Sequence, residues 1–380
     1  MKNKILSCVY AHFEAHGPGI YHNELLAKST KNLDVYYSKV METTWNFPSN
    51  VRLISDRNRI IPWERIYKMN IIKRWTLFFW YTFKMLILIR KNNYDLIVVF
   101  NPPALLSLSI ISPFINGNTQ LWYHNYDPLD ASKNKKFSLQ YFSYRAMARI
   151  FPKLTLFTHS EEKRDSFFPL KLLKSPRIIL PNYSMLEMHS GVPRDLDANV
   201  VKIIFSGVIS HGNGLEDLIK ISKKKIGDYN IKLILKGFVI QEYKEGLESL
   251  IKETGTHEFV EFIGPGPWKE VPEILRRAHI GIHIFHKDDI ISKTMGKGGS
   301  GKVFQYIAEG LPVLMSPGFK NNFLGHKWAV PTSLDHSDLI KNINYIVENY
   351  YDLSQAAIHS FKSELNCNSY FDDIFYNLNK

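Results

Sequence analysis

Short apolar runs recur along the first half of the chain, and longer amphipathic stretches separate them. Apolar runs of about four to eight residues are typical of strands buried on both faces. The stretches between them are amphipathic in the manner of helices, as in GIYHNELLAKSTKN at 19–32. The apolar runs of this first series are KILSCVY (4–10), LDVYYSKV (33–40), NVRLIS (50–55), YDLIVVF (94–100), QLWYHNY (120–126), LTLFTHS (154–160) and RIILPN (177–182). Strands that alternate with helices predict right-handed βαβ units and a parallel sheet.

A second series of the same kind begins after the polar stretch HSGVPRDLDANV (189–200). Its apolar runs are VKIIFSGV (201–208), IKLILKGF (231–238), FVEFIG (259–264), IGIHIF (280–285) and LPVLMS (311–316). The pattern therefore predicts two doubly wound α/β domains joined by a linker near residues 185–200. Ligands of such domains bind at the carboxyl ends of the strands. The loops after these runs, around a cleft between the domains, are therefore the predicted functional sites.

Composition excludes two broad classes of protein. Aromatic residues make up 13% of the 380 residues and hydrophobic residues 45%, which is too apolar for an intrinsically disordered chain. There are only two cysteines, Cys8 and Cys367, so a disulfide scaffold is excluded and a reducing compartment is favoured.

The excess of positive charge lies in the first half of the chain. The net charge is +12, and residues 1–190 alone carry 26 Lys and Arg against 13 Asp and Glu. An imbalance of this kind favours an anionic partner, either nucleic acid or a membrane surface, over an evenly solvated basic face.

The most apolar segment lies within this basic half, at Trp75–Ile89, and contains Lys84. Its fifteen residues fall short of the about 20 that span a bilayer, so it predicts a buried amphipathic helix or a helix that also contacts lipid. Four basic residues precede it: Arg65, Lys68, Lys73 and Arg74. The apolar run after Met1 is too short for a secretory signal, so a cytoplasmic location is expected.

A glycine-rich turn stands before the last apolar run, in KGGSGKVFQYIAEGLPVLMS at 297–316. Backbone N–H groups at the start of a helix, together with the Ser300 hydroxyl and the Lys302 ammonium, form a possible anion site. The turn is not a P-loop, because Val303 follows the lysine where that motif has Ser or Thr.

Further motifs are spread over both halves of the chain. Those of the second half are FSGVISHGNGLEDLIK (205–220), LILKGF (233–238), FVEFIGPGPWKEVPEILRRAHIGIHIF (259–285) and SGKVFQYIAEGLPVLMS (300–316). Those of the first half are HGPG (16–19), WYHNYDP (122–128), FTHSEEKRD (157–165) and ILPNY (179–183). With these motifs in this order, the chain resembles the GT-B glycosyltransferases, particularly the family 4 class that takes sugars from nucleotide-sugars. The resemblance implies a GT-B fold of two Rossmann-like domains facing a central cleft. An acceptor domain at 1–188, a donor domain at 200–355 and a helix at 356–380 that returns to the first domain are expected.

The sequence departs from the family pattern at two places. Family members usually carry a Glu, seven residues and a second Glu beside the donor, and the aligned residues here are Lys297 and Gln305. Glu309, one helical turn after Gln305, is a candidate to supply the missing hydrogen-bond acceptor. The usual Arg and Lys beside the diphosphate align with Val208 and Asn213, so Lys302 and Lys236 are the expected substitutes.

The resemblance then gives a full set of site residues. His124, with Asp127 nearby, is expected to face the reacting sugar as a contact or as a group that moves a proton. The expected donor-binding residues are Gly17, Gly19, Gly207, Asn213, Gly214, Lys236, Lys297, Ser300, Gly301, Lys302, Gln305 and Glu309. Arg65, Lys68, Lys73 and Arg74 are expected to meet the acceptor or a membrane.

The expected activity is a metal-independent, retaining sugar transfer from a nucleotide-sugar, with a UDP-sugar favoured over a GDP-sugar. The basic first domain favours a lipid-linked glycan acceptor at the inner face of the cell membrane, as in the assembly of bacterial surface polysaccharide such as lipopolysaccharide or capsule. Three alternatives stay open: a nucleotide-sugar epimerase, a non-catalytic binding subunit, and a nucleic-acid binder. The last fits the charge but has no recognition motif, so no nucleic-acid partner is expected.

Overall fold

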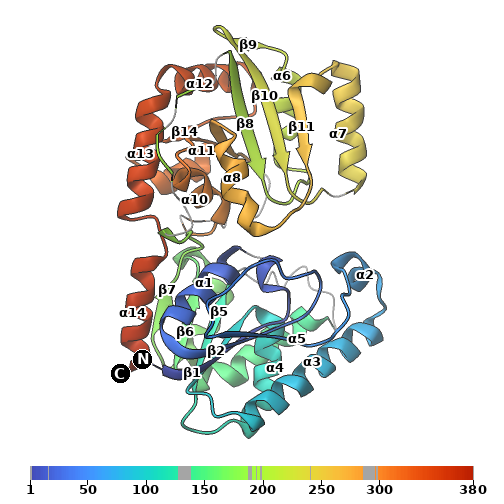
Figure 1. Ribbon diagram of the computed structural model, residues 1–380, viewed down its shortest axis with the longest axis vertical. Helices are drawn as coiled ribbons and strands as arrows, with labels where there is room; N and C mark the ends of the chain where they lie inside the picture. The colour runs from blue at the N-terminus through green and yellow to red at the C-terminus, as the bar shows by residue number, and fades with distance from the viewer. Residues whose placement is uncertain are drawn as a thin grey trace. The chain divides into compact units, whose positions relative to one another are not determined.

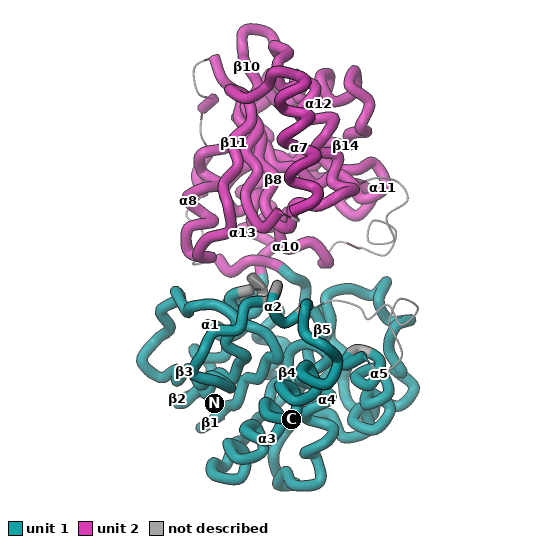
Figure 2. Tube along the Cα trace, turned by 90° about the vertical axis from the view of Figure 1, so that its right-hand side faces the viewer, with its two compact units in different colours: residues 1–182, 367–380 teal, residues 183–366 magenta. Residues whose placement is uncertain are grey.

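The computed structural model describes residues 2–15, 17–126, 138–186, 191–193, 195–196, 199–239, 241–285, 296 and 298–379. The chain divides into two compact units, coloured separately in Figure 2. Unit 1 consists of Met1–Asn182 and Cys367–Lys380, and unit 2 of Tyr183–Asn366. Each is a parallel α/β layer structure, which confirms the predicted GT-B class of fold.

Unit 1 is built on one parallel sheet with the order β3-β2-β1-β4-β5-β6-β7 (Figure 1). Its strands are β1 (Lys2–Val9), β2 (Thr30–Tyr37), β3 (Val51–Ser55), β4 (Leu96–Phe100), β5 (Gln120–Asn125), β6 (Leu156–His159) and β7 (Arg177–Ile179). Its helices are α1 (Gly17–Lys28), α2 (Trp63–Lys68), α3 (Ile71–Lys91), α4 (Pro102–Ile111), α5 (Leu139–Ile150) and α14 (Asn368–Asn379). Single 3-10 turns η1 (Phe13–Ala15), η2 (Ser112–Phe114), η3 (Phe151–Lys153), η4 (Glu162–Phe167) and η5 (Leu170–Leu172) complete the unit.

Helices cover both faces of the unit 1 sheet. The helices α3, α4 and α5 bury their apolar faces against one side, where Tyr81, Leu105 and Met147 join a single core cluster with the strands. The other side is covered by α1 and by the returning α14. Phe371 of α14 lies against Trp122 of β5, with ring centroids 6.1 Å apart, and the carbonyl oxygen of Leu378 accepts a hydrogen bond from Gln120.

The apolar segment Trp75–Ile89 and the basic residues before it lie on two helices. The helix α2 ends at Lys68 and α3 begins at Ile71. Asn70 stands between them as the N-cap of α3, and its side chain accepts a hydrogen bond from the backbone N–H of Lys73. An N-cap asparagine satisfies one of the free N–H groups that start a helix, so a new helix begins there.

Unit 2 repeats the same topology on a sheet of order β11-β10-β8-β12-β13-β14, with β9 antiparallel at β10. The strands are β8 (Val200–Ser206), β9 (Lys225–Ile226), β10 (Tyr229–Lys236), β11 (Val260–Ile263), β12 (Ile280–His283), β13 (Val313–Met315) and β14 (Ala329–Pro331). The helices are α6 (Leu215–Ile221), α7 (Gln241–Thr254), α8 (Val271–Arg276), α10 (Gly301–Ala308), α11 (Pro317–Lys320), α12 (His336–Glu348) and α13 (Tyr350–Ser363). Its 3-10 turns are η7 (His257–Phe259), η8 (Trp268–Glu270) and η9 (Asn321–Phe323).

Candidate functional site

Both sheets reverse their strand order beside their first strand. In unit 1 the reversal lies between β1 and β4, and in unit 2 between β8 and β12. At such a point the connections leave in opposite directions, and the carboxyl ends of the strands border a ligand-binding crevice. The side chains at these two places therefore form the candidate site of each unit.

In unit 2, an ammonium group stands at the carboxyl end of β8. Lys302, in the first turn of α10, places its Nζ 4.0 Å from the centre of the Phe205 ring. A Cβ atom on Gly207 would lie 3.4 Å from the same Nζ, and Gly207 has a φ of 139°, which glycine adopts without strain. Burial lowers the pKa of Lys302 to about 8. The lysine that sequence reasoning favoured thus lies at the switch point, in a poorly solvated position.

A second lysine lies one strand away. Lys236 ends β10, in register with Ser206 of β8, and is buried. Its Nζ donates a 2.6 Å hydrogen bond to the carbonyl oxygen of Gly264, and burial lowers its pKa. Two ammonium groups from neighbouring elements therefore border the same end of the sheet.

His283 completes this group, and sequence reasoning did not single it out. It ends β12 with only 1% of its surface exposed, and its ring stacks on Phe319 at 4.3 Å. Neither ring nitrogen has a hydrogen-bond partner within the described part of the chain. Burial, and then the charge of Lys302, hold the pKa of His283 well below its usual value. The one available signal was a histidine at an inward position of the apolar run IGIHIF.

Five other predicted donor residues of unit 2 lie near this same end of the sheet. Ser300 and Gly301 begin α10, and Gln305 is buried within it. Gly214 has a φ of 65° and begins α6, and the side-chain amide of Asn213 contacts Ser210 within the same loop after β8. These residues thus surround the carboxyl end of β8.

Glu309 lies elsewhere. It follows the last turn of α10, fully buried, and its carboxylate is 2.9 Å from Nε of Arg276. The sequence predicted that Glu309 would accept hydrogen bonds from a ligand. Its carboxylate is instead paired with Arg276, at the C-terminal end of α10. Lys297 falls outside the described residues.

In unit 1, the carboxyl ends of the strands carry buried histidines. His124 of β5 is fully buried, and its Nδ1 lies 2.7 Å from the Thr158 hydroxyl oxygen of β6. His22 of α1 meets it edge to face, with ring centroids 4.8 Å apart. Nε2 of each histidine is without a hydrogen-bond partner among the described residues. Burial lowers the pKa of His22 to about 3 and holds that of His124 well below its usual value, so both imidazoles are neutral at pH 7.

The glycines of unit 1 shape the start of α1. Gly17 is its first residue, and a Cβ atom on Gly19 would come within 2.6 Å of the Phe13 carbonyl oxygen. A side chain at Gly19 would therefore push α1 away from η1, and His22 lies on this same helix. Asp127 lies outside the described residues.

The basic residues of unit 1 border an exposed apolar strip. Arg65 and Lys68 lie on α2 and Lys73 and Arg74 on α3. The buried side of α3 presents Phe78, Tyr81, Thr82, Met85 and Ile89 to the core, and the large exposed apolar residues of the helix are Ile71, Ile72, Phe79, Trp80 and Phe83. We call these five residues and the four basic ones the α3 surface. Over the described residues, no helix has the length and apolarity needed to cross a bilayer.

No group of three or more His, Cys, Asp or Glu side chains in the described ranges is arranged to hold a metal ion. The polar groups at the two switch points are instead ammonium groups, neutral imidazoles and backbone N–H groups. Such a set is suited to oxygen atoms of anionic and hydroxylated ligands.

Comparisons with known proteins relate the second half of the chain to one family and the whole chain to solved structures of the same fold. Residues 193–360 match the family model described as glycosyl transferases group 1. A search of curated proteins found no significant match. Among solved structures, a sucrose-phosphate synthase from Thermosynechococcus elongatus has a TM-score of 0.74 at 14% identity, over 99% of each chain.

Two other similar structures are those of HepE and WaaG. HepE from Anabaena, in complex with UDP and glucose, has a TM-score of 0.69 at 14% identity over 99% of each chain. WaaG, a glycosyltransferase involved in lipopolysaccharide biosynthesis, has a TM-score of 0.68 at 14% identity, over 97% of this chain and 99% of that one. The chain therefore has the fold of the GT-B glycosyltransferases, and its residues 193–360 match the model of the glycosyl transferases group 1 family.

Proposed function

We propose that the protein is a glycosyltransferase that takes a sugar from a nucleoside diphosphate sugar held by unit 2. The observation that carries the proposal is the position of Lys302, at the strand switch point of the group 1 domain and beside the side-chain-free Gly207. In such a place a diphosphate can approach both the ammonium group and the backbone.

The geometry supports a specific role for the lysines. When the bond between the sugar C1 and the phosphate oxygen breaks, its electron pair stays on the diphosphate, and negative charge grows there. Lys302 and Lys236 stabilise that charge, together with the N–H groups of Gly301 and its neighbours at the start of α10. The acceptor hydroxyl oxygen forms the new bond to C1, and its proton passes to an oxygen atom of the departing diphosphate. The group 1 match supports retention of configuration at C1.

A UDP-sugar is the proposed donor, because the similar HepE structure holds UDP. Gln305 takes the place of a family carboxylate, and its amide both donates and accepts hydrogen bonds, as the ribose hydroxyls require. The same replacement is the one observation that favours a non-catalytic binding subunit, which would bind the nucleotide without transferring the sugar.

Thermal unfolding with UDP, GDP, CMP, ADP and dTDP tests the donor site. A nucleotide at a hundred times its Kd stabilises the protein by about 2.7 kcal/mol. We expect UDP to give the largest rise in melting temperature, and Lys302→Ala to abolish that rise. The matched control is Lys252→Ala, which removes an equal charge from an exposed position on α7 and leaves the response intact.

Two results would contradict this assignment. One is the absence of a shift with any of the five nucleotides. The other is an unchanged response to UDP in Lys302→Ala. Binding of UDP without transfer of sugar to any acceptor would instead favour the non-catalytic subunit.

We further propose that the acceptor is lipid-linked and is met at the inner face of the cell membrane, as in the assembly of bacterial surface polysaccharide such as lipopolysaccharide or capsule. The support is the α3 surface, which joins exposed aromatic and aliphatic side chains to four basic residues. Aromatic and aliphatic groups partition into the headgroup region, and each basic residue near an anionic surface adds about 1 kcal/mol.

Sedimentation with lipid vesicles tests the α3 surface. We expect binding to vesicles that contain anionic lipid, weaker binding at high salt, and a loss of about tenfold in affinity for the double variant Ile72→Ser, Phe79→Ser. Leu324→Ser is the matched control, because Leu324 of unit 2 is 75% exposed and Ile72 is 72% exposed. Equal binding of both variants, or salt-sensitive binding to DNA in place of vesicles, would overturn the proposal.

A further inference from the structure

The histidine at the end of β5 is held by two residues of the same sheet face. His124 is the register partner of Thr158 across β5 and β6, and Trp122 precedes it by two residues, so its side chain lies on the same face. Nε1 of Trp122 donates a 2.8 Å hydrogen bond to the Thr158 hydroxyl oxygen, and that oxygen is 2.7 Å from Nδ1 of His124. All three side chains are fully buried.

These contacts fix where the imidazole proton lies. The Thr158 hydroxyl has one hydrogen and accepts from Trp122, whose indole N–H can only donate. Within the described chain, the acceptor available to the Thr158 hydrogen is Nδ1 of His124. Nδ1 therefore accepts a hydrogen bond and carries no proton. In the neutral ring the proton must then be on Nε2.

Nε2–H is the group left without a partner. Nε2 of His124 has no hydrogen-bond partner among the described residues, although it is fully buried. A buried donor without an acceptor costs about 1–3 kcal/mol, so such groups are rare unless a ligand satisfies them. The ring nitrogen beside it, Nε2 of His22, is in the same condition.

We propose that Thr158, itself held by Trp122, is a positioning residue that fixes His124 as a neutral imidazole whose Nε2–H donates a hydrogen bond to an oxygen atom of the sugar substrate. This inference rests on the proposed function for the identity of the ligand. It also changes the expected role of His124. An imidazole that presents N–H toward the substrate is a hydrogen-bond donor and does not act as a general base through that nitrogen.

The surroundings keep the ring neutral. The titratable and charged groups around His124 are His22 on α1, Tyr126 after β5, His159 at the end of β6, and Arg164 on η4. Burial and the two neighbouring histidines lower the pKa of His124, and Arg164 acts in the same direction. His159 is engaged separately, with its Nε2 2.8 Å from a carboxylate oxygen of Asp165.

Nitrogen NMR of the histidine rings tests the proposal directly. In ring-labelled protein, with the His124 signals identified by their loss in His124→Gln, we expect Nδ1 to be unprotonated and Nε2 to carry the proton at pH 7. A proton on Nδ1 would overturn the proposal. This readout does not depend on activity, so it decides the proposal even if no sugar transfer is found.

Three variants add a functional readout. Thr158→Val removes the hydroxyl and keeps the shape. We expect a loss of kcat on the order of tenfold, smaller than the about 10²–10³ lost with a whole catalytic donor, and an unchanged KM for the nucleotide-sugar. Thr158→Ser should restore most of the activity. Thr155→Val, which removes a hydroxyl just before the opposite end of the same strand, should leave kcat and the His124 signals unchanged.

The pH profile separates positioning from simple destabilisation. A hydrogen bond donated to Nδ1 favours the neutral ring, so its loss in Thr158→Val should raise the pKa of His124 and move the acidic limb of kcat to higher pH. An acidic limb that stays in place, with kcat as in the wild type, would overturn the proposal. If Thr158→Val does not fold, the wild-type NMR result and the Thr158→Ser profile still decide it.

Discussion

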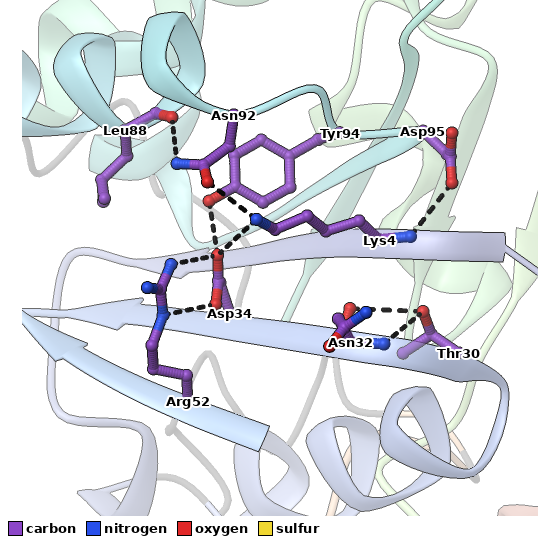
Figure 3. Close-up of polar contacts among 9 residues, drawn as sticks. All are labelled: Lys4, Thr30, Asn32, Asp34, Arg52, Leu88, Asn92, Tyr94 and Asp95. Carbon is purple, nitrogen blue, oxygen red and sulfur yellow. Dashed lines mark hydrogen bonds and ion pairs between the residues drawn. The ribbon is translucent and has the colours of Figure 1, made fainter. Parts of the chain in front are cut away.

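The two ends of the unit 1 sheet treat buried polar groups in opposite ways. Toward the amino ends of the strands, the buried carboxylate of Asp34 on β2 is fully engaged (Figure 3). Both of its oxygens receive 2.8 Å hydrogen bonds from Arg52 of β3, and the Tyr94 hydroxyl donates another at 2.6 Å. Nζ of Lys4 is 3.9 Å away. At the carboxyl ends, by contrast, Nε2 of His124 and of His22 lack partners in the described chain.

On the proposed function, the contrast separates groups that hold the fold from groups that meet a ligand. A buried charge that is removed from water must be paired, and the pairing of Asp34 leaves nothing for a substrate. A buried donor without a partner lowers stability, and a ligand that accepts its hydrogen bond is the explanation proposed above for His124. In unit 2 the same division appears between Glu309, paired with Arg276, and His283, whose ring nitrogens have no hydrogen-bond partner among the residues that the structure describes.

The largest effect should come from removing the Asp34 carboxylate. Asp34→Leu removes the carboxylate and leaves the arginine that it held, so we expect a loss of about 3–5 kcal/mol in the free energy of unfolding. Urea unfolding measures this loss. The fraction that stays folded should keep the kcat of the wild type, and a selective loss of kcat would contradict the structural role of Asp34.

At the carboxyl ends of the strands, a substitution of His124 should lower kcat more than stability. His124→Phe removes the free donor and keeps a planar ring, so we expect kcat to fall by about 10²–10³. The free energy of unfolding should fall by less than about 3 kcal/mol, because the loss of the unsatisfied Nε2–H offsets part of the cost of leaving the Thr158 hydroxyl without its acceptor. Steady-state kinetics and urea unfolding on the same preparation give both values. A variant that loses stability but whose folded fraction keeps the wild-type kcat would refute the role assigned to His124.

A smaller, pH-dependent effect is expected in unit 2. Burial lowers the pKa of Lys302 to about 8, so the ammonium group loses its proton as the pH rises through that value. The affinity for UDP should therefore fall about tenfold between pH 7 and pH 9. In Lys302→Arg the guanidinium stays charged, and calorimetric titration should show a nearly flat profile. A wild-type affinity that does not change over this range would be inconsistent with Lys302 at the diphosphate.

A single neutral partner of the Asp34 network should contribute less than the carboxylate itself. Tyr94→Phe removes one hydrogen bond to the carboxylate and keeps the ring in the core, so the free energy of unfolding should fall by about 1.5–3 kcal/mol. Urea unfolding provides the measurement. An unchanged stability would show that Asp34 is satisfied by Arg52 alone.

Much of the fold follows from local sequence. The apolar runs at 94–100, 201–208 and 231–238 each became a buried parallel strand, because their length and continuity suit a strand covered on both faces. The glycine-rich turn before Lys302 likewise stands where the pattern of strands and helices predicted a ligand loop. Each of these signals is contained in a short stretch of sequence, so it can be recognised without a structure.

The parts that could not be predicted depend on contacts between distant segments. His22 meets His124 across about a hundred residues of sequence, and the partner of Glu309 is Arg276 of another helix. The chain returns to unit 1 at Cys367, and α13 still belongs to unit 2. The sequence predicted a returning helix at 356–380, which includes the second half of α13. Helical periodicity shows that a face is buried, but it does not show against which unit.

Hydrogen exchange with and without UDP tests the central claim most directly. We expect UDP to protect backbone amides at 207–214, 236–238 and 298–305, which surround the carboxyl end of β8, and to leave those around Asp34 and Tyr94 unchanged. Protection confined to the amino ends of the strands, or none at saturating UDP, would contradict the placement of the donor and with it the proposed transferase.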